Sequence, residues 1–228
     1  MNFQQKEKNL KKYLEILKKC PLFSDIREED LPVMLGCLGA KVEFFDKKYT
    51  ILAEGSPANR IGIVLSGAVQ VTQVDYFGNR SILSELGVSE VFGEAFACAE
   101  SGAIPVSVIA SEPCEIMLLS SEHVLRTCSN HCAFHSRLIY NLMRDLAEKT
   151  IQFHQRIEIT SKRSTREKLM AYLLMLVKRE GRAEIEIPFD RQELADYLEV
   201  DRSGLSAEIS KLRREGVLDC HKNRFVLL

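Results

Sequence analysis

The sequence predicts an α+β protein with three successive parts: an antiparallel β-domain, one long helix, and a C-terminal winged helix-turn-helix. Three observations lead to this prediction. Residues 41–119 alternate short apolar runs with glycine and Asp or Asn turns, residues 121–160 contain neither Pro nor Gly, and residues 190–228 hold two short helical patterns before two short strands. We therefore expect domains at residues 1–120 and 161–228, joined by a long helix over residues 121–160.

The composition is that of a globular protein. The chain has 228 residues, of which 46% are hydrophobic and 28% are charged, enough for two compact cores. No stretch approaches the roughly 18 apolar residues of a membrane span, and the N-terminus lacks the apolar core of a signal peptide. The seven cysteines are scattered and odd in number, unlike a secreted disulfide framework. These features predict a cytoplasmic protein with no membrane partner.

The charge distribution is uneven. The net charge is −1, but residues 1–120 carry 12 basic and 16 acidic side chains, whereas residues 161–228 carry 14 basic and 12 acidic ones. This bias is mild, so contacts to nucleic acid would have to come from local clusters such as Arg202, Lys211, Arg213 and Arg214. A solvated helix face is the alternative explanation for the same residues.

Two helices are expected ahead of the β-domain. Residues 4–19 have an amphipathic pattern that ends at Cys20-Pro21. Ser24 or Asp25 is expected to cap a second helix, which would run to Leu38 and end at Gly39. Neither helix carries recognisable chemistry.

Seven strands are expected in the β-domain. Ser66-Gly67 and residues 76–80 contain turn residues, and the latter are expected to form a hairpin turn. Strands at such spacing predict a sandwich or a barrel. The expected strands cover residues 42–45, 49–53, 60–65, 69–74, 81–86, 106–110 and 114–119.

The C-terminal part has its own helix signals. Asp190 is expected to cap a first helix, with Glu193 completing a capping box, and Asp201 is expected to open a second helix after a two-residue turn. That helix should end at Gly216 after a basic last turn. Two helices joined in this way have the geometry of DNA-binding motifs, although helix pairs in enzymes share the spacing. Residues 217–220 and 224–228 are expected to form a hairpin, or wing, with Asn223 at positive φ.

An ordered set of segments resembles the CRP/FNR superfamily of bacterial transcription regulators over roughly residues 10–228. The segments are Glu54-Gly55, residues 63–71, residues 78–83, Phe92-Gly93-Glu94, and the C-terminal run 191–195. The resemblance implies a cyclic-nucleotide-binding-like β-roll of the jelly-roll type, a dimerisation helix and a winged helix-turn-helix. It further implies a homodimeric, sequence-specific regulator of promoter DNA that is controlled by a small-molecule effector and is not an enzyme. RNA polymerase is a further candidate partner.

The resemblance also directs attention to an effector site. In cyclic-AMP-binding relatives, the Glu of a Gly-Glu pair accepts a hydrogen bond from a ribose hydroxyl, and a downstream Arg-Ser pair holds the cyclic phosphate. Gly93 and Glu94 match the Gly-Glu pair. The positions of the Arg-Ser pair fall here at Ile104 and Pro105, with Ser107 two residues later, and no arginine lies between Arg80 and Arg126. A cyclic phosphate would lack its bidentate partner, so we expect an effector other than cyclic AMP.

Two roles remain open for Glu94: a polar contact to another effector, or a structural carboxylate that caps a short helix over residues 95–99. The expected effector pocket comprises Phe92, Gly93, Glu94, Ala95, Ile104, Pro105, Ser107, Phe153 and His154.

The long helix is expected to pair two copies of the chain. One apolar stripe has near-heptad spacing, and a second stripe with Ile139, Met143 and Ala147 flanks it, so one face can cover the β-roll while the other meets a second copy. A two-fold dimer would place its two recognition helices about one DNA turn apart. The expected dimer interface is Leu138, Leu142, Leu146, Thr150, Phe153 and Ile157. Residues 159–163 would then form a hinge, followed by a capping box at Ser164 that opens another helix.

DNA contacts are assigned by resemblance. Arg202, Ser203 and Ala207 occupy the three positions from which relatives commonly send Arg, Glu and Arg to base edges, so only Arg202 keeps the expected type. Loss of an arginine at Ala207 should relax or redirect sequence preference. The full set of expected DNA-contacting residues is Gln192, Arg202, Ser203, Ser206, Ala207 and Lys211.

A metal site is the main alternative to a small-molecule effector. Cys128, Cys132 and His135 would share one face of a helix, and their donors suit zinc, copper or iron in a metal-, haem- or redox-responsive regulator. Small core residues are the simpler explanation for the cysteines. A cupin-like metalloenzyme is disfavoured because all five histidines lie outside residues 41–119. No metal or other cofactor is therefore assigned.

Overall fold

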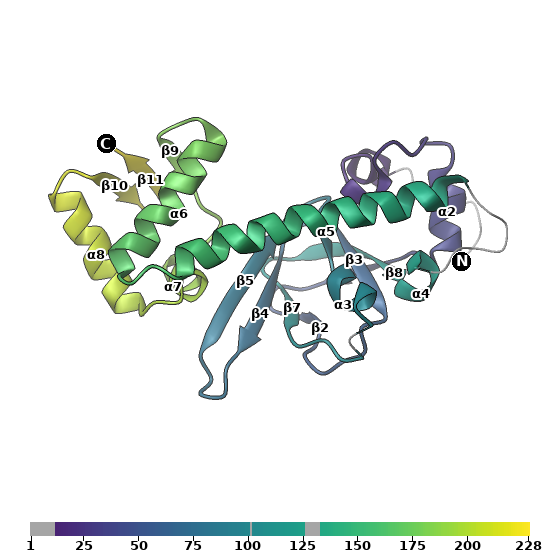
Figure 1. Ribbon diagram of the computed structural model, residues 1–228, viewed down its shortest axis with the longest axis horizontal. Helices are drawn as coiled ribbons and strands as arrows, with labels where there is room; N and C mark the ends of the chain where they lie inside the picture. The colour runs from purple at the N-terminus through teal and green to yellow at the C-terminus, as the bar shows by residue number, and fades with distance from the viewer. Residues whose placement is uncertain (1–11, 101, 126–132) are drawn as a thin grey trace. The chain divides into compact units, whose positions relative to one another are not determined.

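The computed structural model describes residues 12–100, 102–125 and 133–228 (Figure 1). They belong to two compact units, the first within residues 1–73 and 84–149, the second comprising residues 74–83 and 150–228. Each unit has its own hydrophobic core. In the part of the chain that the structure describes, no helix has both the length and the apolar character that a bilayer crossing requires.

The first unit begins with short helical segments. Residues 12–17 are helical, a 3₁₀ turn η1 (Pro21–Phe23) follows, and α2 spans Leu31–Cys37. The predicted start of the second helix at Ser24 or Asp25 was wrong, because Asp25 has a φ of 58° and forms part of a turn. The helix instead begins after Asp30, with a proline in its first turn, and its predicted end is confirmed by Gly39 at a φ of 65°.

Two antiparallel four-stranded sheets follow, in the orders β1-β8-β3-β6 and β2-β7-β4-β5. Successive strands repeatedly change sheet, as expected for a β-roll. The strands are β1 (Lys41–Phe45), β2 (Thr50–Leu52), β3 (Arg60–Ser66), β4 (Val69–Val74), β5 (Arg80–Leu86), β6 (Val91–Phe92), β7 (Ser107–Ala110) and β8 (Cys114–Ser120). All seven predicted strands are confirmed, whereas β6 was missed because two residues give no periodicity.

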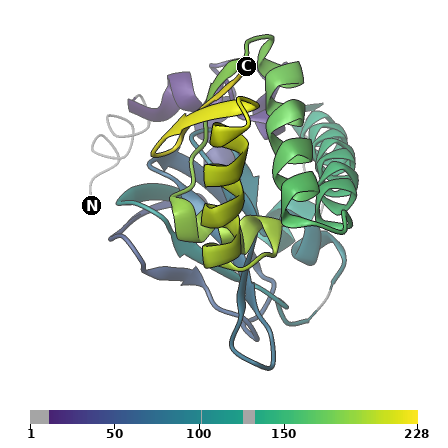
Figure 2. The same cartoon turned by 90° about the vertical axis from the view of Figure 1, so that its left-hand side faces the viewer.

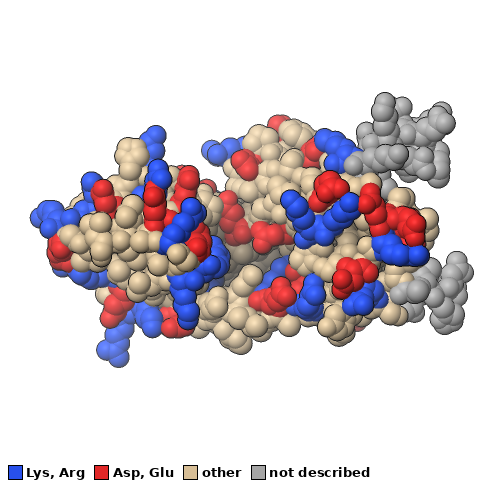
Figure 3. Space-filling view, turned by 90° about the horizontal axis from the view of Figure 1, so that it is seen from above, with Lys and Arg blue, Asp and Glu red and all other residues tan. Residues whose placement is uncertain are grey.

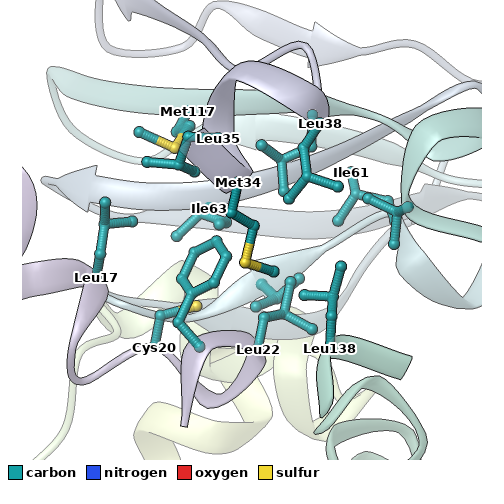
Figure 4. Close-up of a cluster of buried hydrophobic side chains, with 14 of the residues drawn as sticks. Leu17, Cys20, Leu22, Met34, Leu35, Leu38, Ile61, Ile63, Met117 and Leu138 are labelled. Carbon is teal, nitrogen blue, oxygen red and sulfur yellow. The ribbon is translucent and has the colours of Figure 1, made fainter. Parts of the chain in front are cut away.

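Strands β3 and β8 are buried on both faces, which explains their nearly continuous apolar sequences. On one face, Ile61, Ile63 and Leu65 of β3 join Met117 and Leu119 of β8 in a core with the N-terminal helical segments (Figure 4). On the other face, Gly62 leaves room for an aromatic ring from β6. A Cβ atom at Gly62 would lie 2.1 Å from Phe92 Cζ, so the absence of a side chain is what allows the ring to pack there.

Helices α3 (Glu94–Cys98), α4 (Ser121–Leu125) and α5 (Ala133–Thr160) complete the helices of this part of the chain. The prediction of one unbroken helix over residues 121–160 was wrong. His135 Nε2 lies 3.1 Å from the carbonyl oxygen of Val124, yet eleven residues of continuous α-helix would separate the two by about 16 Å. Residues 126–132 lie outside the described residues.

The second unit contains α6 (Thr165–Glu180), β9 (Glu184–Glu186), α7 (Arg191–Leu198), α8 (Arg202–Arg214), β10 (Leu218–His221) and β11 (Arg224–Leu227). Its helix starts follow local chemistry. Ser164 and Asp190 both form complete capping boxes, and Asp201 caps α8 through the backbone N–H of Gly204. Gly216 follows α8 at a φ of 70°. The predicted caps and the helix-turn-helix are therefore confirmed.

The wing is a three-stranded sheet of order β10-β11-β9, one strand more than predicted. Lys222, at a φ of 55°, takes the left-handed position that was assigned to Asn223. Asn223 instead uses its side-chain amide to bond Glu186 Oε1 and the carbonyl of Ile187. Its amide thus joins the turn to β9, and the neighbouring lysine accommodates the positive φ.

The tip of the β4–β5 hairpin belongs to the second unit. Ile82 is fully buried in that unit's core. The guanidinium of Arg156, near the C-terminal end of α5, donates to the carbonyls of Ile82 and Leu83 at 2.5 and 3.1 Å. It also lies 4.6 Å from the centre of the Tyr197 ring, so hairpin, α5 and α7 are joined by one buried cation.

Candidate DNA-binding and effector sites

One face of α8 is available to a partner. Its opposite face packs into the core of the second unit through Leu205, Ile209 and Leu212. Arg202, Ser203, Ala207 and Lys211 are exposed and Ser206 is half-buried, so the five predicted contacts on this helix share its accessible side. Figure 2 shows α8 at the front of the second unit with the β10–β11 strands above it.

The cations of this face differ in how they are held. Within the described residues, neither the guanidinium of Arg202 nor the ammonium of Lys211 makes a hydrogen bond or an ion pair. By contrast, Arg213 pairs with Asp219 of the wing at 2.9 Å, and Arg191 donates to the Lys222 carbonyl at 3.3 Å. A long side chain that is not already paired can reach a phosphate or a base without first breaking a contact.

A groove of about 180 Å³ lies between α8 and the wing. It is lined by Arg191, Ser206, Ile209, Ser210, Arg213, Cys220 and Lys222. Three of these residues are cationic and none is acidic. The second unit nevertheless mixes charges over its surface, as Figure 3 shows for one face, so its positive field is local.

Gln192 is oriented by a neighbouring network. Its Nε2 donates to Asp196 Oδ1 at 2.8 Å, and Asp196 Oδ2 accepts from both Nε and Nη2 of Arg80, at 2.9 and 2.8 Å. Arg80 comes from the hairpin tip, so this hairpin is linked to a predicted DNA contact by two steps. This link could not be predicted from the sequence, because 116 residues separate Arg80 from Asp196.

The N-terminus of α8 is held by acceptors. Asp201 Oδ2 accepts from the backbone N–H of Gly204 at 2.8 Å and from the hydroxyl of Ser203. These two bonds lower the pKa of the exposed Asp201 carboxyl, the serine bond having the larger effect. The carboxylate is therefore ionised at neutral pH, and the serine proton points toward it.

Seven of the nine predicted effector residues lie in the first unit, some in its interior and some at its surface. Phe92, Glu94 and Ile104 are buried, Gly93 and Ser107 are half-buried, and Ala95 and Pro105 are exposed. The hydroxyl oxygen of Ser107 accepts from the backbone N–H of Glu54 at 3.1 Å, so it is already engaged. Phe153 and His154 belong to the second unit, where both are exposed.

Glu94 is held by a cation that the sequence reasoning missed. Only 4% of this residue is exposed, and its Oε1 lies 2.8 Å from Lys149 Nζ. The same ammonium lies 2.8 Å from Asp145 Oδ2 and donates to the Val91 carbonyl at 2.8 Å. A helix cap by the Glu94 side chain is not observed, since α3 has no side-chain cap. The structural role of Glu94 is thus an ion pair.

The ammonium of Lys149 is paired with two carboxylates but makes hydrogen bonds to only two oxygens. It donates to Glu94 Oε1 and to the Val91 carbonyl, whereas Asp145 Oδ2, at 2.8 Å, is an ion-pair partner that has no hydrogen bond within the described residues. Desolvation lowers its pKa, but the two carboxylates outweigh that effect and leave the pKa raised. One feature of the sequence could have indicated this ion pair. Asp145 and Lys149 are four residues apart and so share one face of the helix, and in the structure that face points into the first unit rather than to solvent.

The predicted dimer stripe on α5 needs one correction. Leu138 and Leu142 are buried in the core of the first unit and Leu146 packs against it, so the first two cannot contact a second copy. The helix turns this stripe toward its own β-domain. Thr150, Phe153 and Ile157 are exposed, and so are Tyr140, Met143 and Ala147.

The predicted metal ligands Cys128 and Cys132 lie outside the described residues. The third, His135, is buried with Nε2 against the Val124 carbonyl. The described parts of the chain hold no cluster of three or more His, Cys, Asp or Glu side chains that could bind a metal ion.

Comparison with known families bears on both sites. Residues 42–131 match the cyclic nucleotide-binding domain family, and residues 167–228 match the Crp-like helix-turn-helix domain family. The chain belongs to the CRP/FNR family of transcription regulators. Regulators of this family bind DNA through the helix-turn-helix and combine it with an effector-binding domain.

Individual relatives within the CRP/FNR family are distant. The global nitrogen regulator of Nostoc sp. is 23% identical over 84% of this chain and 87% of its own length. The cyclic AMP receptor protein of Thermus thermophilus is 25% identical over 89% of both chains. Among solved structures, the c-di-GMP responsive global regulator CLP of Xanthomonas campestris aligns with a TM-score of 0.72 at 18% identity, over 86% of this chain and 97% of its own. This last likeness shows a shared fold.

Proposed function

We propose that this CRP/FNR-family chain is a homodimeric regulator that binds pseudo-palindromic promoter DNA and responds to a small-molecule effector other than cyclic AMP. The observation that carries the DNA-binding part is the exposed face of α8, where Arg202 and Lys211 project from a helix whose other face is buried. Arg202 would contact a base, and Lys211 and Gln192 would contact phosphates. The protein would act in the cytoplasm, with RNA polymerase as a further partner.

The dimer would form along the exposed apolar face of α5. Tyr140, Met143, Ala147, His154 and Ile157 follow heptad a and d spacing, so they lie on one side of the helix. In the single chain, Met143 is 58% exposed and Ile157 is 61% exposed. Pairing two such faces would bury apolar surface and place two α8 helices on successive major grooves.

The Lys149 contacts argue against an anionic effector at Glu94. The ammonium is already paired with the carboxylates of Glu94 and Asp145, so a cyclic phosphate would have to displace a carboxylate to gain its charge. No arginine lies between Arg80 and Arg126 to take its place. The site is therefore better suited to a neutral or cationic molecule than to a cyclic nucleotide.

Selection of binding sites from a random duplex library tests the DNA-binding function. We expect an enriched pseudo-palindrome with half-site centres about 10 base pairs apart. Arg202→Ala should remove the preference for one base in each half-site, whereas Lys178→Ala, an exposed cation on α6, should leave the preferences unchanged. Binding should weaken with salt in proportion to the phosphates contacted. Failure to enrich any sequence would refute the function.

Calorimetric titration with cyclic AMP tests the effector assignment. We expect no heat of binding with ligand up to the millimolar range, and no change in affinity for the selected duplex. Saturable binding of cyclic AMP that Glu94→Gln abolishes would refute the assignment of another effector, but it would not contradict the proposed DNA-binding function.

A further inference from the structure

The start of α8 presents hydrogen-bond acceptors where the family position commonly held by glutamate is occupied by Ser203. The Ser203 hydroxyl donates its proton to Asp201 Oδ2, so its remaining capacity toward a partner is to accept. Asp201 is an ionised carboxylate that can only accept. Both residues are exposed, next to the unpaired guanidinium of Arg202.

We propose that Asp201 and Ser203 act together as an acceptor pair that reads the exocyclic amino group of a cytosine or an adenine, beside the base contacted by Arg202. This inference rests on the proposed DNA-binding function and names how part of its specificity arises. In the major groove, the base edges offer hydrogen-bond donors only through cytosine N4 and adenine N6. Guanine and thymine present acceptors at the corresponding positions, and these would face the carboxylate unfavourably.

The negative charge of Asp201 also explains why this acceptor pair would discriminate between DNA sequences rather than raise the affinity for all of them. DNA phosphates repel a negative charge at the start of a recognition helix, so Asp201 lowers affinity for every duplex. Where an amino group is in place, the acceptor pair gains a charge-assisted hydrogen bond that offsets the repulsion. Asp201 therefore increases discrimination while it decreases affinity for random DNA.

Two variants separate this role from the helix cap. Asp201→Asn keeps an oxygen for the Gly204 N–H, and asparagine caps helices about as well as aspartate, so the fold should be retained. Ser203→Ala removes the hydroxyl. Ser161→Ala is the matched control, because the exposed Ser161 hydroxyl, outside the groove and the α8 contacts, donates to the Glu158 carbonyl at 3.1 Å.

The test is fluorescence anisotropy of the full chain with a duplex chosen by binding-site selection and with a random duplex. Asp201→Asn should bind the random duplex at least about twofold more tightly and lose at least about fivefold of the selected-to-random ratio. Ser203→Ala should lose part of that ratio, and Ser161→Ala none.

Base analogues then identify the group that is read. At the position where Asp201→Asn relaxes the preference, 2-pyrimidinone in place of cytosine, or purine in place of adenine, removes only the amino group. The loss in affinity should be at least about fivefold for the wild-type chain and near zero for Asp201→Asn. Equal losses in both proteins, or an unchanged ratio in Asp201→Asn, would overturn the acceptor pair alone. A wild-type chain that selects no sequence would instead refute the DNA-binding function on which it rests.

Discussion

Replacement of Lys149 by methionine should destabilise the first unit more than any surface substitution. Methionine has a similar length, so the main change is loss of the ammonium that Glu94 and Asp145 share. Both carboxylates would remain buried without their cation. A conservative second change, Glu94→Gln in the same chain, removes one of them and should restore part of the lost stability.

The magnitude follows from the burial of the three groups. Removing one partner of a buried ion pair costs about 3–5 kcal/mol. A buried carboxylate without its cation can become neutral by taking up a proton. Protonation costs about 1.4 kcal/mol for each pH unit above the ordinary pKa near 4, so at pH 7 the loss of stability is limited to about 4 kcal/mol per carboxyl group. Because 19% of the Lys149 side chain is exposed, we expect a loss of about 3 kcal/mol, toward the lower end.

Urea unfolding followed by circular dichroism, at a fixed protein concentration, measures this loss. In the variant, the deficit should shrink at pH 5, since carboxyls whose folded pKa is raised stabilise below their unfolded pKa and destabilise as pH rises. In the wild type, the raised pKa of Lys149 implies stabilisation below pH 10.5, its ordinary value, that is lost as pH rises through the folded pKa. A variant within about 0.5 kcal/mol of the wild type at pH 7 would show that the buried triad is not a stabilising ion pair.

Three further predictions concern packing, coupling and assembly. Gly62→Ala should destabilise the β-roll by about 1–3 kcal/mol, because the new methyl would overlap the Phe92 ring, as chemical denaturation would show. Arg80→Ala should weaken binding to the selected duplex by about two- to fivefold, since Asp196 loses the cation that fixes it, with stability changed by no more than about 1 kcal/mol. Met143→Glu should raise the dimer dissociation constant at least about tenfold in analytical ultracentrifugation, because it places a charge in an apolar interface.

Each of these has a control that shares its chemistry. Gly36→Ala adds a methyl in α2 where nothing lies within 4 Å, so stability should be unchanged or slightly increased. Lys162→Ala breaks an exposed ion pair with Glu158 and should leave DNA affinity within about twofold. Val33→Glu introduces the same charge at an exposed apolar position of α2 and should leave the dimer intact. Equal effects in a variant and its control would contradict the corresponding prediction.

Features set by nearby residues were predictable from the sequence alone. The capping box at Asp190 and Glu193 needs only a carboxylate and a glutamate three residues apart, so the start of α7 follows from local hydrogen bonding. The seven recognised strands follow from apolar runs between turn residues, and the turn at residues 76–80 follows from Gly and Asn at its corner. The order of segments that resembles the CRP/FNR superfamily added the family and its general function.

The tertiary structure decided which side chains meet across long distances in sequence. Lys149 pairs with Glu94, 55 residues away, because α5 turns one face toward β6 and α3, and the same orientation buries Leu138 and Leu142 in the first unit's core. Periodicity shows that a helix has an apolar face but does not say which neighbour covers it. The separation of α4 from α5 escaped prediction for a related reason: a stretch without Pro or Gly permits one helix, whereas the contact of His135 with the Val124 carbonyl is incompatible with a continuous helix through both residues. Local chemistry therefore determined the elements, and packing energies summed over distant residues determined their partners.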